Sequence, residues 1–277
     1  MAKTWFITGT STGLGRLLTE RLLARGDSVI ATLRRPGALD DLQARYGEQL
    51  RIVMLDVTDT AATRAALKQA FDQAGRIDVL VNNAGYGLFG VAEAVSDAQI
   101  ERQIATNLTG SIQLIRAALP YLRAQGGGRI VQISSEGGQI TYPNFSLYHA
   151  TKWGIEGFIE SVAHEVATFG IDFLIIEPGP TATSFATGLD QAAPLPCYEN
   201  TPASEMRRAI ASGDFAIKGD AAKTVEAIIL TADLPAPPLR LALGSTAYQS
   251  ISKALAARRK ELEENKPLTL SADREDD

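Results

Sequence analysis

A tyrosine and a lysine four positions apart are the side chains of this sequence best suited to proton transfer. Tyr148 and Lys152 lie at the start of a stretch with helical spacing, so their side chains share one helix face. An unperturbed tyrosine has a pKa of about 10, and a nearby ammonium lowers that pKa. Tyr148 could then give a proton to a carbonyl oxygen or take one from a hydroxyl.

A glycine-rich turn near the N-terminus could hold a phosphate group. The glycines are spaced Gly-x-x-x-Gly-x-Gly between a short apolar run and a stretch with helical spacing. The free N–H groups and the positive dipole end of a starting helix favour a pyrophosphate there. Taken alone, the turn is as compatible with a tight strand–helix connection as with cofactor binding. Its residues are Gly9, Thr10, Ser11, Thr12, Gly13, Leu14 and Gly15.

Two arginines follow the second apolar run and bear on the choice of cofactor. Leu33 occupies the position at which NAD-binding sheets usually place Asp or Glu to hold the ribose 2′-hydroxyl. A missing carboxylate removes repulsion against a 2′-phosphate, and the guanidinium groups of Arg34 and Arg35 can bind that phosphate bidentately. The pattern favours NADP(H) over NAD(H). The alternative is that both arginines are merely solvated loop residues.

The order of apolar runs along the chain predicts the scaffold that positions these groups. Short apolar runs alternate with longer amphipathic stretches, as is typical of a parallel sheet buried on both faces. We therefore expect a doubly wound parallel sheet in an α/β fold of the Rossmann type. Strands are expected at 3–8, 28–33, 51–55, 79–81, 129–134, 172–177 and 240–243. Helices are expected at 14–25, 61–74, 99–123 with a break near Thr106, 148–169, 221–230 and 250–264.

A single domain is expected to span residues 1–265 of the 277-residue chain. The segment 183–219 is rich in proline and lacks a strong period, so it predicts an insertion with one or two short helices that covers the substrate. The acidic end, 266–277, is expected to be frayed. An apolar and bulky ligand is indicated by the insertion's side chains Phe185, Ala186, Leu189, Leu195 and Phe215.

The composition of the chain disfavours several classes of binding partner. The formal net charge is −5 and the sequence has no long Lys/Arg block, which disfavours nucleic acid and anionic membranes. The single cysteine, Cys197, excludes an intrachain disulfide, and His164 lacks further ligands at metal-binding spacing, so no metal site is expected. No apolar run reaches the about 18 residues of a membrane span. These features predict a cytoplasmic protein.

His149, next to Tyr148, is expected to be structural or to line a substrate pocket.

Five motifs follow one another along the chain. They are TGTSTGLG at 8–15, Asn82-Asn83-Ala84-Gly85, Asn107, Ser135 thirteen residues before Tyr148 with Lys152, and Glu177-Pro178-Gly179. With these motifs in this order, the sequence resembles the short-chain dehydrogenase/reductase family, and the similarity covers about residues 3–183. Within the family, the stretches VIATLRRP and EPGP are similar to members that act on hydroxysteroids or retinoids.

The resemblance implies a role for each catalytic residue. Tyr148 would be the general acid in reduction and the general base in oxidation, and Lys152 would lower its pKa and hold the nicotinamide ribose. Ser135 would polarise the reacting oxygen, and Asn107 would hold a water that links Lys152 to solvent. The substrate would be a small molecule with a ketone or secondary alcohol, and the chain would form a homodimer or homotetramer.

The resemblance also implies the remaining cofactor contacts. Asp56 and Val57 would meet the adenine, and Asn83, Ala84 and Gly85 would pass the adenosine ribose and brace the sheet. The nicotinamide would be bounded by Pro178, Gly179, Thr181 and Thr183.

Three other functions compete with an NADP(H)-dependent oxidoreductase. One is an NAD(H)-dependent alcohol dehydrogenase. A second is a nucleotide-binding regulator without turnover, which predicts damage to the Ser/Tyr/Lys set, whereas here the set is whole. A third is an epimerase or dehydratase acting on a nucleotide-sugar, for which the chain after Thr183 is short.

Overall fold

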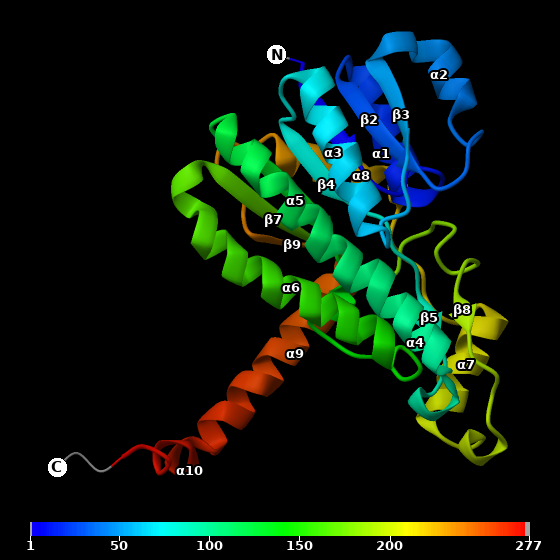
Figure 1. The fold of residues 1–277 in the computed structure, drawn as a ribbon. Helices are drawn as coiled ribbons and strands as arrows, with labels where there is room; N and C mark the ends of the chain where they lie inside the picture. Colours follow the sequence, from blue (N-terminus) through cyan, green and yellow to red (C-terminus); the bar gives the residue numbers. More distant parts are fainter. Residues whose placement is uncertain (1, 275–277) are drawn as a thin grey trace.

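Seven parallel strands form the central sheet of this computed structural model, which describes residues 2–274 (Figure 1). The strand order is β3-β2-β1-β4-β6-β7-β9, so successive strands run outward in one direction to β3 and then restart beside β1 with β4. This order confirms the predicted doubly wound fold, whose ligand crevice lies where the order reverses. The strands are β1 (Thr4–Ile7), β2 (Ser28–Leu33), β3 (Leu50–Met54), β4 (Val79–Asn82), β6 (Gly128–Ile133), β7 (Ile171–Pro178) and β9 (Arg240–Leu243).

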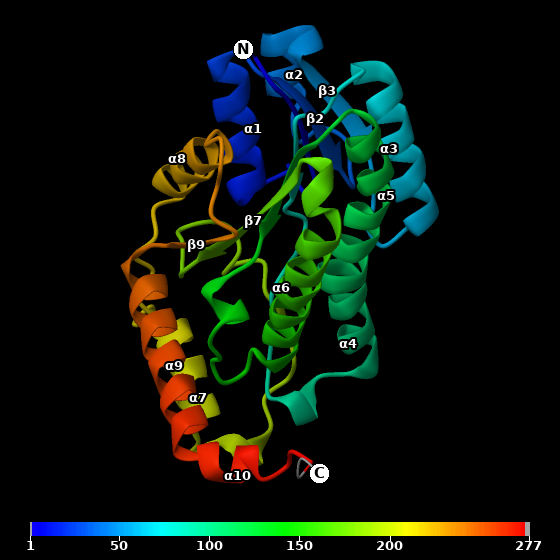
Figure 2. The same cartoon turned by 90° about the vertical axis from the view of Figure 1, so that its left-hand side faces the viewer.

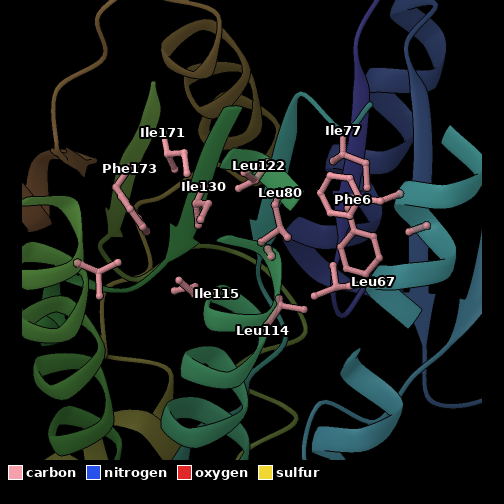
Figure 3. Packing of buried hydrophobic residues seen from close by; sticks show 14 of the residues in the cluster. Phe6, Leu67, Ile77, Leu80, Leu114, Ile115, Leu122, Ile130, Ile171 and Phe173 are labelled. Atoms are coloured by element: carbon pink, nitrogen blue, oxygen red, sulfur yellow. The ribbon is translucent and has the colours of Figure 1, made fainter. Parts of the chain in front are cut away.

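Helices cover both faces of the sheet (Figure 2). One face carries α3 (Thr60–Ala74), α5 (Ser111–Ala124) and α6 (Ser146–Val166), and the other carries α1 (Gly13–Arg25) and α8 (Ala221–Ala232). Successive strand residues point to opposite faces, so each strand supplies both cores. In β1, Phe6 packs with Leu80 and Ile130 toward α3 and α5 (Figure 3), while Trp5 and Ile7 pack toward α1. Burial on both faces explains the nearly continuous apolar strands.

The helical region expected at 99–123 is divided as predicted. It consists of α4 (Asp97–Ile104) and α5, joined by a π-helical segment from Ala105 to Gly110. Single π turns change the direction of side chains without ending a helix. Ser96 begins α4 with a capping box in which its hydroxyl accepts from the Gln99 N–H.

Most elements lie within three residues of their expected bounds, and three helical segments differ more from the prediction. The short helix α2 (Asp40–Tyr46) was not predicted, and α9 (Ser245–Glu264) begins five residues before the predicted helix at 250. Residues 266–270, expected in a frayed tail, form the short helix α10 (Lys266–Leu270) because Pro267 suits a helix N-terminus. Residues 275–277 lie outside the described residues, and fraying there stays a prediction.

The segment 183–219 is attached to the body at both its base and its middle. At the base, a parallel bridge joins Thr181 to Gly219. In the middle, β8 (Asp190–Gln191) pairs in parallel with β5 (Leu88–Phe89), the strand that follows the β4 loop. The segment also contains helix α7 (Pro202–Ser212), where the Ala203 carbonyl accepts from the Asn144 side chain at 2.7 Å. The expected short helix is present, and the segment contacts the body of the domain at these three places.

Within residues 2–274, no helix combines the length and hydrophobicity needed to cross a membrane. In the same part of the chain, no three His, Cys, Asp or Glu side chains cluster to hold a metal ion.

Candidate active site

A single cavity of about 1060 Å³ gathers nearly all the predicted site residues. It opens at the carboxyl ends of the sheet strands, because its wall is built from the residues that follow or end β1, β2, β3, β4, β6 and β7. Such crevices bind the ligands of doubly wound sheets. The predicted residues on its wall are Gly9, Ser11, Thr12, Gly13, Leu14, Arg34, Arg35, Asp56, Val57, Asn83, Ala84, Gly85, Ser135, Tyr148, Lys152, Pro178, Gly179, Thr181 and Thr183.

Three predicted residues do not line the cavity. Thr10 is buried, and its hydroxyl donates to the Thr32 carbonyl at 3.0 Å. Gly15 packs inside the turn, and Asn107 lies behind the wall with its side chain on the backbone of Tyr86. These residues hold the wall in shape.

The glycine turn needs glycine for two separate reasons. Gly9 and Gly13 have φ angles of +68° and +59°, which other residues rarely adopt. At Gly15 a Cβ would lie 2.4 Å from the Gly9 carbonyl oxygen, so the turn must be close-packed there. Asn83 donates from Nδ2 to the carbonyl oxygens of Thr8 and Gly9, both at 2.9 Å, and so joins the turn to the end of β4.

The start of α1 is suited to an anion. Thr12 is the N-cap residue, and its side chain makes no capping hydrogen bond to the helix. Gly13 and Leu14, the first helical residues, line the cavity directly. Backbone N–H groups and the helix dipole therefore meet the cavity, which is the arrangement that favours a pyrophosphate.

Ser135, Tyr148 and Lys152 converge on the same cavity from two elements. Ser135 follows β6, and its hydroxyl accepts from the Gly137 N–H at 3.0 Å. Tyr148 and Lys152 lie one turn apart on α6, with Lys152 Nζ 5.5 Å from the centroid of the Tyr148 ring. Lys152 Nζ also donates to the Ile133 carbonyl oxygen at 2.9 Å. The structure thus brings the predicted set together.

Burial dominates the proton affinities of this set. Tyr148 is buried, and burial raises its pKa to about 12, while the adjacent Ser135 hydroxyl acts in the opposite direction. Burial lowers the pKa of Lys152 to about 8, and Glu156 partly offsets this. The tyrosine pKa therefore lies above its ordinary value, in contrast to the lowering that the neighbouring lysine was expected to cause. Tyr148 is a neutral phenol at neutral pH, the form that donates a proton.

The far end of the cavity carries the two arginines. Arg34 and Arg35 are exposed, and within residues 2–274 neither forms an ion pair. Asp56 stands on the same wall, where hydrogen bonds from Thr58 lower its pKa and Arg34 contributes in the same direction. Its Oδ1 accepts from the Thr58 N–H at 2.9 Å, so Asp56 is held in place at this end.

Buried carboxylates beneath the site were missed by sequence reasoning. Glu156, one turn after Lys152, accepts from the Ser134 hydroxyl and from Arg240 Nη1, the latter at 2.6 Å. Arg240 of β9 also pairs with Glu177. A glutamate on the buried face of α6 was the available signal, because charged residues are rarely fully buried without a partner. This network ties α6 to the end of the sheet.

The insertion supplies the apolar part of the wall. Phe185, Ala186, Leu189 and Phe215 line the cavity as the sequence indicated, whereas Leu195 does not. The Phe185 ring lies 5.5 Å from the Tyr148 ring, centroid to centroid. The apolar side chains therefore reach the reacting end of the cavity.

A family model described as short chain dehydrogenase matches residues 3–193. The chain belongs to the short-chain dehydrogenase family. Oxidoreductase BOA17 of Botryotinia fuckeliana is 38% identical over 259 residues, covering 92% of this chain and 93% of that protein. A crystal structure of a short-chain dehydrogenase from Streptomyces avermitilis has 39% identity, a TM-score of 0.91 and coverage of 98% of each chain. Serine dehydrogenase complexed with NADP⁺ has 27% identity and a TM-score of 0.74, covering 87% of this chain and 94% of that one.

Membership settles the class of reaction. This short-chain dehydrogenase is an oxidoreductase that acts on CH–OH groups of small molecules. The sequence-based assignment of the family, the fold and the enzyme class is confirmed.

Proposed function

We propose that this chain transfers hydride between NADP(H) and a ketone or secondary alcohol, with Tyr148 as the proton donor or acceptor. The observation that carries the proposal is that Ser135, Tyr148 and Lys152 share one cavity with the glycine turn. A nucleotide held at the turn and a carbonyl held at the tyrosine would therefore meet in the same space.

The residues present fit a nicotinamide dinucleotide. One cavity wall includes the N–H groups at the start of α1, the exposed arginines after β2 and the loop after β7. When bound, the cofactor would supply or accept the hydride, which is chemistry that no protein side chain performs. Gly13 and Leu14 would hold its pyrophosphate, and Pro178, Gly179 and Thr181 would bound its nicotinamide.

Proton movement is the part of the reaction that falls to the chain's own residues. Ser135 Oγ and the Tyr148 hydroxyl would both hydrogen-bond the substrate oxygen, which polarises a carbonyl toward attack. With a pKa of about 12, Tyr148 stays protonated and can donate to that oxygen. Lys152 would hold the ribose hydroxyls and return a proton toward Tyr148. The Asn107 side chain is bound to the Tyr86 backbone, so its role in holding a relay water stays a prediction.

A preference for NADP(H) is the finer part of the proposal. Arg34 and Arg35 are exposed on the cavity wall. Within the described residues, neither arginine forms an ion pair with a carboxylate. A 2′-phosphate would give both guanidinium groups an anionic partner. Serine dehydrogenase complexed with NADP⁺ shows that a chain of this fold can hold that cofactor. An assembly of two or four copies and a cytoplasmic location also stay predictions.

Tyr148→Phe tests the proposed chemistry. The substitution removes the hydroxyl alone, so turnover should fall by at least about a thousandfold while NADPH binding changes little. Turnover is followed at the nicotinamide absorbance with a panel of ketones, and binding by NADPH fluorescence. Lys152→Ala is the comparison and should weaken both properties. Equal turnover in wild type and Tyr148→Phe would refute the role of the tyrosine.

The regulator without turnover makes a different prediction in the same assay. Wild-type protein would then bind NADPH tightly and reduce no member of a broad ketone panel. The intact geometry of Ser135, Tyr148 and Lys152 favours the enzyme.

A further inference from the structure

His149 is a buried imidazole on the cavity wall that uses only one ring nitrogen. Its exposed fraction is 4%, and it borders the cavity next to Tyr148. Nδ1 accepts a hydrogen bond from the Tyr142 N–H at 3.3 Å. A neutral imidazole that accepts at Nδ1 carries its proton on Nε2. Within residues 2–274, no hydrogen bond joins Nε2 to another group and this nitrogen is not enclosed by protein, so a donor is accessible there.

Gly137 lies beside both His149 and Ser135. A Cβ built on Gly137 would lie 3.0 Å from His149 Nε2 and 3.3 Å from Ser135 Oγ. A single point beside the glycine is therefore close both to the open donor and to the hydroxyl assigned to the reacting oxygen. Gly137 itself lines the cavity. Two oxygens of one small group can consequently reach Ser135 and His149 at the same time.

The surroundings of His149 select the kind of oxygen. The rings of Tyr142, Phe145 and Tyr148 lie 6.0, 6.0 and 5.9 Å from its ring, centroid to centroid. Burial lowers the pKa of His149 to about 4, so the ring is uncharged near neutral pH. The buried carboxylate of Glu136 lies on the same wall and accepts from the Tyr142 hydroxyl at 2.7 Å. A neutral donor beside a carboxylate suits an uncharged acceptor and disfavours a substrate carboxylate.

We propose that His149 Nε2–H binds a second, uncharged oxygen of the substrate close to the reacting carbonyl. The preferred substrate class is an apolar ketone with a neutral carbonyl a few bonds away, as in a 3-oxo ester. This inference rests on the proposed carbonyl reduction. His149 would be a specificity residue because a bound substrate displaces water from this donor, and a substrate without the second oxygen leaves the donor without a partner.

Two substitutions distinguish the contribution of Nδ1 of His149 from that of Nε2. His149→Asn places an amide near Nδ1 and removes the donor at Nε2, whereas His149→Gln places an amide near Nε2. The probes are hexyl 3-oxobutanoate and a methyl ketone of equal chain length in which methylenes replace the ester. The ratio of the two kcat/KM values with NADPH is measured in each protein, so that a common loss of activity cancels.

We expect the wild type to prefer the 3-oxo ester, and this ratio to fall about tenfold in His149→Asn. His149→Gln should retain most of the preference. A ratio that is the same in wild type and His149→Asn would overturn the inference, because the ester would then gain nothing from Nε2.

A binding measurement decides the question without turnover. Diethyl malonate has two neutral carbonyl oxygens and no ketone to reduce, and its Kd is measured on the protein saturated with NADPH. Tighter binding to wild type and His149→Gln than to His149→Asn supports the inference, and equal binding overturns it. If the wild type reduces neither probe, the proposed reduction fails, while the malonate comparison still decides the role of His149.

Discussion

The side chain of Asn107 hydrogen-bonds both backbone groups of Tyr86. Its Oδ1 accepts from the Tyr86 N–H at 3.1 Å, and its Nδ2 donates to the Tyr86 carbonyl at 2.8 Å. Asn107 lies in the π-helical segment between α4 and α5, which turns it toward the loop after β4. Tyr86 follows Gly85 on the cavity wall. Asn107 therefore holds the loop that the cofactor would contact.

Asn107→Leu should destabilise the protein more than Gln103→Met. Leucine is close to asparagine in shape, but it leaves the partly buried Tyr86 N–H without a partner, at a cost of about 2 kcal/mol. Gln103 Nε2 also donates to the Tyr86 carbonyl, at 3.1 Å, and that carbonyl keeps Asn107 when Gln103 is replaced. Urea unfolding followed by circular dichroism gives both free energies. Equal losses of unfolding free energy in the two variants would show that the hydrogen bond to the Tyr86 N–H adds no stability of its own.

Arg34→Asp should reverse the preference between the two nicotinamide cofactors. The substitution removes a guanidinium and adds a charge that repels a 2′-phosphate, so kcat/KM for NADPH should fall about a hundredfold. The value for NADH should stay level or rise. Arg64→Asp on the exposed face of α3 makes the same charge change away from the cavity and serves as the control. A wild-type NADPH/NADH ratio near one, unaltered in Arg34→Asp, would refute the assignment.

Lys152→Met should stabilise the protein below about pH 8. Burial lowers the folded-state pKa of Lys152 to about 8, so between that pH and about 10.5 the unfolded chain binds more protons. This uptake of protons by the unfolded chain destabilises the wild type. The destabilisation is complete below pH 8 and vanishes above pH 10.5. Its size is on the order of 3 kcal/mol. The Ile133 carbonyl keeps a partner in the variant, because Gln132 Nε2 donates to it at 3.1 Å.

Thermal unfolding of the cofactor-free protein from pH 6 to 10 measures this effect. The gain over wild type should shrink as the pH rises through 8 to 10. The exposed Lys253→Met should show no such trend. A pH-independent difference for Lys152→Met would contradict the lowered pKa.

Arg240→Met should be strongly destabilising. Glu156 and Glu177 are 1% and 3% exposed, and both pair with Arg240, so the variant leaves two buried carboxylates without their cation. Breaking a buried pair in this way costs about 3–5 kcal/mol. Burial already raises the pKa of Glu177, so protonation relieves the loss and the deficit should shrink as the pH falls toward 5. Glu160→Gln, which removes only the exposed partner, should cost less than about 1 kcal/mol in urea unfolding.

The order of elements and the main site residues were readable from the chain alone. Apolar runs alternating with amphipathic stretches predict parallel strands and covering helices, because each pattern reflects which faces are buried. Tyr148 and Lys152 share a helix face by their spacing of four residues, and Ser135 follows the strand β6. The pairing of β5 with β8 was not readable, since two-residue strands carry too little pattern.

Local spacing, then, determined which side chains point the same way. Together with the five motifs, it was enough to name the fold and the family and to predict the reacting residues. Tertiary structure alone decided their chemical state. The raised pKa of Tyr148, the open Nε2 of His149 and the buried carboxylate of Glu156 depend on residues distant in the chain. Burial and electrostatic fields sum over everything packed around a group, whereas sequence periodicity reports only the neighbours along one element.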